Sequence, residues 1–149
     1  MKALLQRVTT AGVSTDGKEV GRIGCGLVVF VGVADGDSRE DIDYLVQKII
    51  NLRIFNDEAG RFNLSLADIG GEMLLVSQFT LLADTRKGRR PSFVDAAVAQ
   101  DAEKLFNLFV DKAAASGLKV STGRFQQYMQ VEIHNDGPVN IMLDSRGGL

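Results

Sequence analysis

Residues that bind metal ions or form disulfides are scarce in this chain of 149 residues. The single cysteine, Cys25, excludes an internal disulfide. One cysteine and one histidine, His134, do not make a zinc site, and the Asp and Glu residues lack the spacing of a calcium loop. We therefore expect no metal site and no other cofactor.

The chain also lacks a long apolar run, a linker and an excess of positive charge. No apolar stretch approaches the roughly 20 residues of a membrane helix, and Arg7 comes too early for a signal peptide. We therefore expect a cytoplasmic protein without membrane contact. A net charge of −2 argues against a protein that holds nucleic acid by bulk charge, so no DNA partner is expected. Without a Pro/Ser-rich linker or an internal repeat, residues 1–149 are predicted to form one domain.

Hydrophobic periodicity predicts an α/β fold. Residues 2–14 alternate as a strand does, Asp16-Gly17 is typical of a hairpin turn, and the apolar run 23–33 predicts a strand buried on both faces. Ser38 and Asp41 predict a capped helix. We expect mixed β-sheets in a barrel-like, three-layer β/β/α domain with two main helices. The helices are predicted at 38–55 and 97–116, and the remaining strands at 61–66, 73–81, 119–125, 129–135 and 139–143.

Ser77-Gln78-Phe79-Thr80 follows an apolar strand at its carboxyl end, where ligands collect in open α/β sheets. The Thr80 hydroxyl could be a nucleophile only with a base within reach, and the one histidine, His134, is distant in sequence. The pattern alone favours a different interpretation, in which this is a strand exit whose hydroxyls satisfy backbone groups.

Residues 82–97 form a loop of about sixteen residues, a length that inside a compact domain is usually functional or disordered. Its cations suit contact with phosphate groups, although charge runs are often only solvated. The neighbouring polar strand end favours a phosphate-bearing ligand. The four cations are Arg86, Lys87, Arg89 and Arg90.

The pattern leaves Gly137-Pro138 and Arg7 open. An X–Pro bond adopts the cis form far more readily than other peptide bonds. Proline also lacks an N–H and fits poorly inside a sheet, so the local pattern favours a hairpin turn at Gly137-Pro138. Arg7 is either an exposed edge cation or a partly buried group that donates a fork of hydrogen bonds. We expect His134 to be structural and Cys25 to be a small buried side chain.

Five stretches occur in an order and spacing typical of one family. They are MKALLQRVTTAGV, GRIGCGLVVFVGV, LRIFNDEAGRFNLSL, LLVSQFTLLADTRKGRRPSF and TGRFQQYMQVEIHNDGPV. With them the chain resembles the D-aminoacyl-tRNA deacylases over nearly its whole length, SQFTL and NDGPV being the specific signatures. The resemblance implies a cytosolic homodimer that hydrolyses the ester between a D-amino acid and the 3′ end of tRNA. It also implies activity on glycyl-tRNA.

The resemblance further implies roles for single residues. Gly137-Pro138 is implied to be a cis dipeptide that enters the partner subunit's pocket and excludes L side chains, and Arg7 to hold its orientation. The terminal 2′-hydroxyl of the tRNA is implied to assist the reaction, which agrees with the lack of a base near Thr80. We expect backbone N–H groups around Gln78 and Phe79 to stabilise the oxyanion. By resemblance, the catalytic pocket comprises Ser77, Gln78, Phe79 and Thr80, the substrate pocket Ala102 and Met129, and the tRNA contacts Arg86, Lys87, Arg89 and Arg90.

One residue departs from the family pattern, because Asn140 stands where the family usually has Thr. We expect activity to survive, since Gly137 and Pro138 make the filter. A related subgroup has a trans Gly-Pro and lacks the Arg at the Arg7 position, so Arg7 favours the cis, D-selective form. Two alternatives remain, a non-catalytic tRNA-binding module that uses residues 86–90 and a dimeric scaffold.

Overall fold

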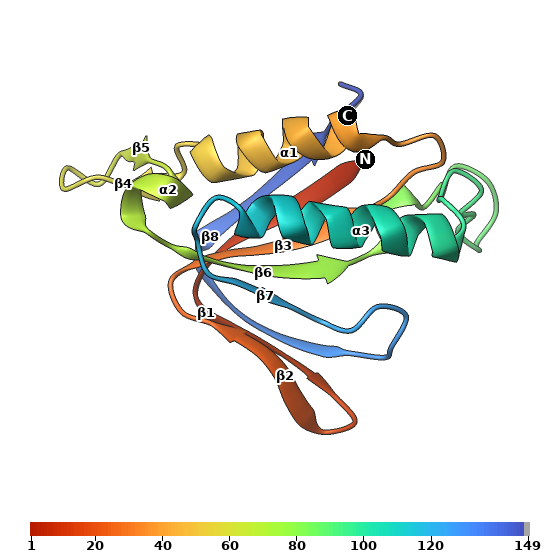
Figure 1. The fold of residues 1–149 in the computed structure, drawn as a ribbon, viewed down its shortest axis with the longest axis horizontal. Helices are drawn as coiled ribbons and strands as arrows, with labels where there is room; N and C mark the ends of the chain where they lie inside the picture. The colour runs from red at the N-terminus through yellow and green to blue at the C-terminus, as the bar shows by residue number, and fades with distance from the viewer. Residues whose placement is uncertain (148–149) are drawn as a thin grey trace.

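The computed structural model describes residues 1–147 and contains a mixed sheet nearly closed into a barrel (Figure 1). The sheet order is β2-β1-β3-β6-β7, and β8 pairs with the other side of β1. The β3–β6 and β6–β7 pairs are parallel, and the remaining pairs in this sheet are antiparallel. The six strands are β1 (Lys2–Thr15), β2 (Lys18–Ile23), β3 (Gly26–Gly32), β6 (Glu72–Ser77), β7 (Val120–Thr122) and β8 (Gln130–Asp144).

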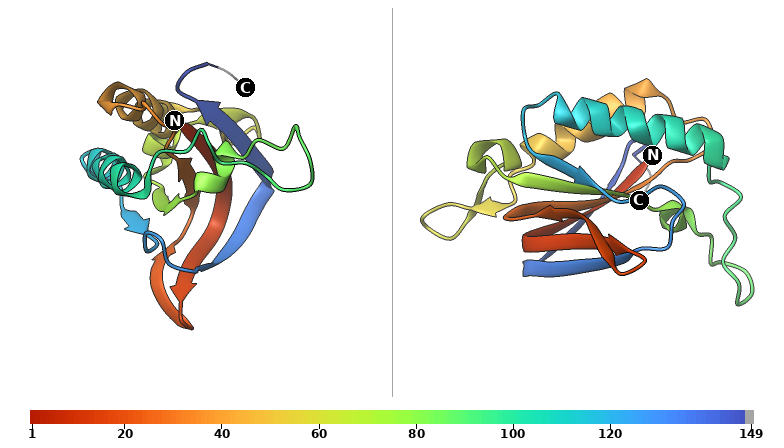
Figure 2. Two further views of the ribbon diagram at one scale, coloured as in Figure 1. Left: turned by 90° about the vertical axis from the view of Figure 1, so that its right-hand side faces the viewer. Right: turned by 60° about the horizontal axis from the view of Figure 1, so that its bottom comes forward.

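Two long helices lie side by side over one face of the sheet, as expected (Figure 2). Helix α1 (Arg39–Asn51) begins with the predicted Ser38–Asp41 capping box but ends before residue 55, because Leu52 is extended. Helix α3 (Ala99–Ala114) lies within the second predicted range, 97–116. The sequence did not predict α2 (Leu66–Ile69), the 3₁₀ helix η1 (Phe79–Leu82) or β4 (Phe55–Asn56). The strand predicted at 61–66 forms as β5 (Phe62–Leu64), which pairs with β4 in a separate two-stranded sheet.

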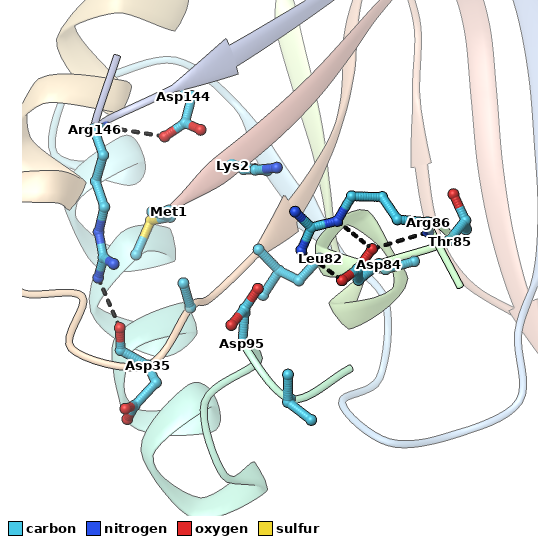
Figure 3. A pocket seen from close by; sticks show the side chains of 13 residues that line it. Met1, Lys2, Asp35, Leu82, Asp84, Thr85, Arg86, Asp95, Asp144 and Arg146 are labelled. Carbon is cyan, nitrogen blue, oxygen red and sulfur yellow. Dashed lines mark hydrogen bonds and ion pairs between the residues drawn. The ribbon is translucent and has the colours of Figure 1, made fainter. Parts of the chain in front are cut away.

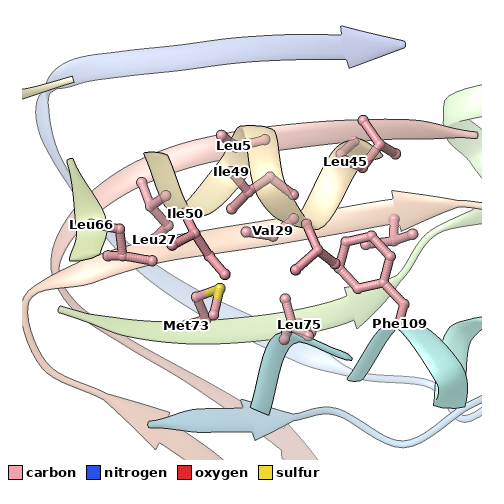
Figure 4. Packing of buried hydrophobic residues seen from close by; sticks show 14 of the residues in the cluster. Leu5, Leu27, Val29, Leu45, Ile49, Ile50, Leu66, Met73, Leu75 and Phe109 are labelled. Atoms are coloured by element: carbon pink, nitrogen blue, oxygen red, sulfur yellow. The ribbon is translucent and has the colours of Figure 1, made fainter. Parts of the chain in front are cut away.

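The apolar alternation of the strands separates into two buried clusters, one on each face of the sheet. Leu27 and Val29 pack toward the helices with Phe109 of α3 (Figure 4). Val28 lies on the opposite face with Val8 of β1, inside the nearly closed barrel. Strand β3 is therefore buried on both faces, as its continuous apolar run predicts. None of the helices in residues 1–147 is long and apolar enough to cross a membrane.

The predicted turn at the start of β2 is confirmed, but the extent of β3 differs from the prediction. Asp16 and Gly17 have φ of +50° and +74°, and Thr15 pairs with Lys18 across the hairpin. The apolar run 23–33 is not one strand, because β2 ends at Ile23 and the chain turns before β3. Cys25 lies in this turn and is exposed, so its predicted burial is wrong.

The hairpin that the local pattern favours at Gly137-Pro138 is also wrong. Strand β8 runs from Gln130 to Asp144 along the whole of β1. Pairing stops after Val8 with Asn135 and resumes at Gln6 with Asn140, so residues 136–139 bulge opposite Arg7 alone. A proline cannot donate to the ladder, and a bulge lets the strand continue past it.

Candidate active site

A cavity of about 780 Å³ opens at the carboxyl end of β6. Five residues that the sequence assigned to the catalytic and substrate pockets line it together: Ser77, Gln78, Phe79, Ala102 and Met129. They come from the end of β6, the start of η1, helix α3 and the segment before β8. Segments far apart in sequence therefore meet at one strand end, as the mixed sheet predicts. The other lining residues are Val33, Val76, Ala96, Ala97, Ala99, Phe125, Gln126, Gln127, Tyr128 and Val131.

Only some backbone N–H groups of residues 77–80 are available to bind a ligand. The Gln78 N–H donates to the carbonyl oxygen of Val31 at 2.8 Å, so it is already paired. Our expectation that it stabilises an oxyanion is therefore wrong. Phe79 and Thr80 begin η1, and the first N–H groups of a helix have no carbonyl partner inside that helix. The donors at this edge are thus displaced by one residue from the expected pair.

Thr80 lies outside the group that lines the cavity. Its side chain is exposed, and its Oγ1 accepts a hydrogen bond from the Gln78 side-chain amide. His134 is on β8, opposite Thr10, and its Nε2 lies 2.8 Å from a Glu132 carboxylate oxygen. A base for Thr80 is therefore not supplied by the histidine. Residues 1–147 contain no group of three His, Cys, Asp or Glu placed to hold a metal ion.

The structure decides between the two interpretations of Arg7, because the residue is only 6% exposed. Its Nε donates to the carbonyl oxygen of Asp136 at 2.9 Å and lies 3.4 Å from the Asp136 carboxylate. Its Nη1 donates to the buried carbonyl of Ile54 at 2.8 Å. Arg7 is a buried group with a fork of hydrogen bonds, as the second interpretation had it.

The Gly137-Pro138 peptide bond is cis, and both residues are exposed on the bulge of β8. Neither lines the 780 Å³ cavity of its own chain. The Asn135 Oδ1 accepts from the Val139 N–H at 2.8 Å, and the Asn135 Nδ2 donates to the Asn140 Oδ1 at 2.9 Å. Asn140, the departure from the family pattern, therefore helps to close the base of the bulge.

The basic loop, residues 82–97, lies beside the cavity, because Ala96 and Ala97 at its end line it. Asp84 and Ser92 exchange backbone hydrogen bonds of 2.8 and 2.9 Å, which close the loop at its base. Phe93, on the returning side, contacts the Phe79 ring edge-on with centroids 4.9 Å apart. The four cations between Asp84 and Ser92, Arg86, Lys87, Arg89 and Arg90, are all exposed.

Arg86 differs from the other three cations, because an internal partner occupies its guanidinium. It donates to the two carboxylate oxygens of Asp84 at 2.9 and 2.7 Å, beside a second cavity of about 570 Å³ (Figure 3). These hydrogen bonds hold the pKa of Asp84 well below its usual range. Lys2, Asp35 and Arg86 are among the charged residues around this cavity.

Sequence reasoning missed the segment that closes the cavity on its far side. The strand predicted at 119–125 ends at Thr122, and the chain then turns through Gln126, whose φ is +58°. Phe125 and Tyr128 of this turn line the cavity, and Tyr128 is 96% exposed. The spacing of these two aromatic residues between two strands was the available signal.

Comparisons with known proteins agree with the resemblance seen in the sequence. The family model described as D-Tyr-tRNA(Tyr) deacylase matches residues 4–144. The D-aminoacyl-tRNA deacylase of Dehalococcoides mccartyi is 58% identical over 149 residues, covering 100% of this chain and 97% of the relative. The D-aminoacyl-tRNA deacylase of Caldicellulosiruptor bescii is 56% identical over 146 residues, covering 98% of both chains.

Two solved structures have the same fold. The c-Myc DNA unwinding element binding protein superposes with a TM-score of 0.91 at 40% identity, covering 97% of this chain and 98% of that one. A probable eukaryotic D-amino acid tRNA deacylase has a TM-score of 0.84 and covers 95% and 97%, but at 18% identity it shows the fold alone. Together with the family match, these similarities show that the chain belongs to the D-Tyr-tRNA(Tyr) deacylase family of hydrolases.

Proposed function

We propose that the protein hydrolyses the ester bond of D-aminoacyl-tRNA, and that of glycyl-tRNA, to release the amino acid and free tRNA. The observation that carries the proposal is that Ser77, Gln78, Phe79, Ala102 and Met129 line one cavity together. Its volume of about 780 Å³ fits one small ligand, such as the aminoacyl-adenosine end of a tRNA, and not a nucleic-acid helix. Relatives at 53–58% identity that carry the name D-aminoacyl-tRNA deacylase support the same substrate class.

In the proposed mechanism, water adds to the ester carbonyl and the bond to the 3′ oxygen breaks, with a proton passing to that oxygen. The aminoacyl ester is already activated, so stabilising the oxyanion supplies much of the necessary help. The N–H groups of Phe79 and Thr80 at the start of η1 are the proposed donors. The 2′-hydroxyl of the terminal adenosine assists the proton transfer, and the mechanism uses no cofactor.

We propose that Gly137-Pro138 is a chirality filter that acts across a homodimer. The dipeptide is exposed on the bulge of β8 and lies outside the cavity of its own chain, which supports insertion into the cavity of the partner subunit. A side chain in the L arrangement would collide with the backbone of the dipeptide, so rejection is steric. Glycine has no side chain and would pass.

Lys87, Arg89 and Arg90 are the proposed contacts with tRNA phosphates. Their loop starts at the end of η1, beside the cavity, so it reaches the nucleotides next to a bound 3′ end. The net charge of −2 makes this a local contact and not a charged surface. Because aminoacyl-tRNA is a cytoplasmic substrate, we place the enzyme in the cytoplasm.

The test is deacylation of D-tyrosyl-tRNA and L-tyrosyl-tRNA by the purified protein. We expect rapid release of D-tyrosine while L-tyrosyl-tRNA is spared. Equal cleavage of both would overturn the filter. Salt-dependent tRNA binding without turnover would instead support a non-catalytic tRNA-binding module. Normal deacylation by a Gly137→Ala, Pro138→Ala double variant would leave a dimeric scaffold or a different active site.

A further inference from the structure

We propose that the small sheet of β4 and β5 positions the chirality filter by holding Arg7, and that Asn56 and Phe62 are its positioning residues. The inference rests on the filter described under the proposed function. The small sheet lies outside both the cavity and the dipeptide. The element is the projection that Figure 1 shows at the end of the molecule near α2.

Arg7 is in contact with the small sheet as well as with the filter. Its Nη1 lies 3.3 Å from the Asn56 Oδ1, in addition to its hydrogen bond to Ile54. Its Cζ lies over the Phe62 ring, 5.4 Å from the centroid, which is the geometry of a cation–π contact. On the other side, Arg7 Nη2 is 3.2 Å from the position that a Cβ on Gly137 would take. The guanidinium thus stands between the sheet and the dipeptide.

The pairing of the two strands explains how both contacts arise. Asn56 pairs with Phe62, and directly paired residues of antiparallel strands point to the same face. The neighbouring pair, Phe55 with Leu64, instead packs on the main core, where Phe55 is 5% exposed. One pair therefore anchors the sheet and the other reaches Arg7.

The hairpin connection is braced, which suits a positioning element. The Asp57 carboxylate accepts from the backbone N–H groups of Ala59 and Arg61 at 2.9 and 3.0 Å. The Asp57 N–H donates to the Arg61 carbonyl at 2.9 Å. Phe62 follows Arg61 directly, so the braced backbone fixes the position of its Cα, although 54% of the residue is exposed.

A hollow beside Arg7 makes this support necessary. A cavity of about 460 Å³ is lined by Arg7, Asn56, Phe55 and Asp136, among others. A long side chain next to open volume has alternative rotamers, and water can compete for its donors. Asn56 shares Nη1 with Ile54, and the Phe62 ring covers one face of the guanidinium. With these contacts in place, Nε remains directed at the Asp136 carbonyl, one residue before Gly137.

The test compares two changes that remove the contacts with two that keep them. The variant Asn56→Ala, Phe62→Leu removes the amide and the aromatic face. Phe62→Tyr keeps the ring, and Glu58→Gln changes an exposed residue in the same hairpin connection. We expect the ratio of kcat/KM for D- over L-tyrosyl-tRNA to fall about tenfold in the double variant. The ratio stays unchanged in Phe62→Tyr and Glu58→Gln.

A purely structural role for the sheet would lower both rates together and leave their ratio unchanged, which would overturn the inference. A wild-type protein that shows no D preference would instead overturn the proposed function. If the double variant does not fold, Phe62→Leu alone decides, because the side chain is half-exposed.

A second measurement does not depend on turnover. Hydrogen exchange at the Arg7 Nε–H, followed by NMR, reports whether the bond to Asp136 persists. We expect exchange to be at least tenfold faster in the double variant than in wild type and Glu58→Gln. Equal protection in all three proteins would overturn the inference.

Discussion

The cavity at the end of β6 and the bulge at Gly137-Pro138 are built in opposite ways. The cavity is lined largely by alanines, apolar side chains and the backbone of a strand exit. The bulge is cross-linked by side chains, because Asn135 bonds to Val139 and Asn140, and Gln6 donates to the Asn140 Oδ1 at 2.8 Å. Arg7 adds a buried cation that holds the carbonyl just before the dipeptide.

The difference follows from what each region has to do under the proposed function. Hydrolysis of an activated ester needs a few backbone donors and room for the substrate. Discrimination between D and L substrates needs a steric barrier at a fixed position, since a shift of about 1 Å can cost on the order of a hundredfold in rate. We infer that polar side chains are concentrated where position matters and not where bonds break.

Gly137→Ala is expected to have the largest effect, because it changes the bulge at Gly137-Pro138 and leaves the cavity intact. Gly137 has φ of +142°, and an added Cβ would lie 2.7 Å from Val139 Cγ2 and 3.1 Å from the Val139 nitrogen. The bulge has to shift, so we expect deacylation of D-tyrosyl-tRNA to fall about a hundredfold. Single-turnover kinetics would measure this.

Gly17→Ala is the matched control for that substitution. Gly17 also has a positive φ, +74°, but lies in the β1–β2 turn with open space around an added Cβ. It therefore loses stability through the backbone alone and keeps wild-type activity. If Gly137→Ala kept both the activity and the preference for D- over L-tyrosyl-tRNA of Gly17→Ala, the bulge would not be the specificity element.

Arg7→Ala tests whether the hydrogen bonds of the buried guanidinium also stabilise the fold. The substitution leaves the buried Ile54 carbonyl and the Asp136 carbonyl without their donor, which costs about 2 kcal/mol of unfolding free energy. Urea denaturation followed by circular dichroism would measure the loss. Arg90→Ala, which removes an exposed arginine of the basic loop, is expected to cost less than about 0.5 kcal/mol. Similar losses for the two variants would contradict the importance of the buried fork.

The sequence predicted most of the sheet and both long helices, because their periodicity and caps are local signals. The Ser38 box and the Asp16-Gly17 turn are confirmed for that reason. The bulge at Gly137-Pro138 could not be read locally, since proline in a strand gives the same pattern as a hairpin turn. Only its pairing with β1 over residues 130–144 decides the matter.

The resemblance predicted the residues of the candidate site, and the structure shows their detailed contacts. The burial of Arg7 depends on Ile54, which is 47 residues away in sequence, so strand periodicity could not reveal it. The occupied Gln78 N–H depends on Val31 of the neighbouring strand. The predicted burial of Cys25 was wrong because the prediction rested on the apolar residues around it, whereas the chain turns there.

Arg89→Ala tests whether the basic loop beside the cavity contacts tRNA. We expect tRNA affinity to fall modestly, and the slope of log affinity against log salt to decrease by about 1. Arg86→Ala is the control, because the Asp84 carboxylate already pairs with its guanidinium, so Arg86 adds little net positive charge for a phosphate. Filter binding of tRNA across a salt series would measure both slopes. Equal slope changes would show that the internal pair opens on binding.

Thr80→Ala carries the smallest expected effect and bears directly on how little side-chain chemistry the cavity needs. Thr80 is exposed, outside the cavity lining, and accepts a bond from the Gln78 side chain. Because the proposed donors are backbone N–H groups, we expect kcat to stay within about threefold of wild type, whereas a removed nucleophile costs more than about a thousandfold. Thr80→Ser, which keeps the acceptor for Gln78, separates loss of that bond from loss of the methyl group. A thousandfold loss in Thr80→Ala with recovery in Thr80→Ser would show that the hydroxyl is catalytic. The reaction in the cavity would then depend on a side chain, as the position of the bulge depends on side-chain hydrogen bonds.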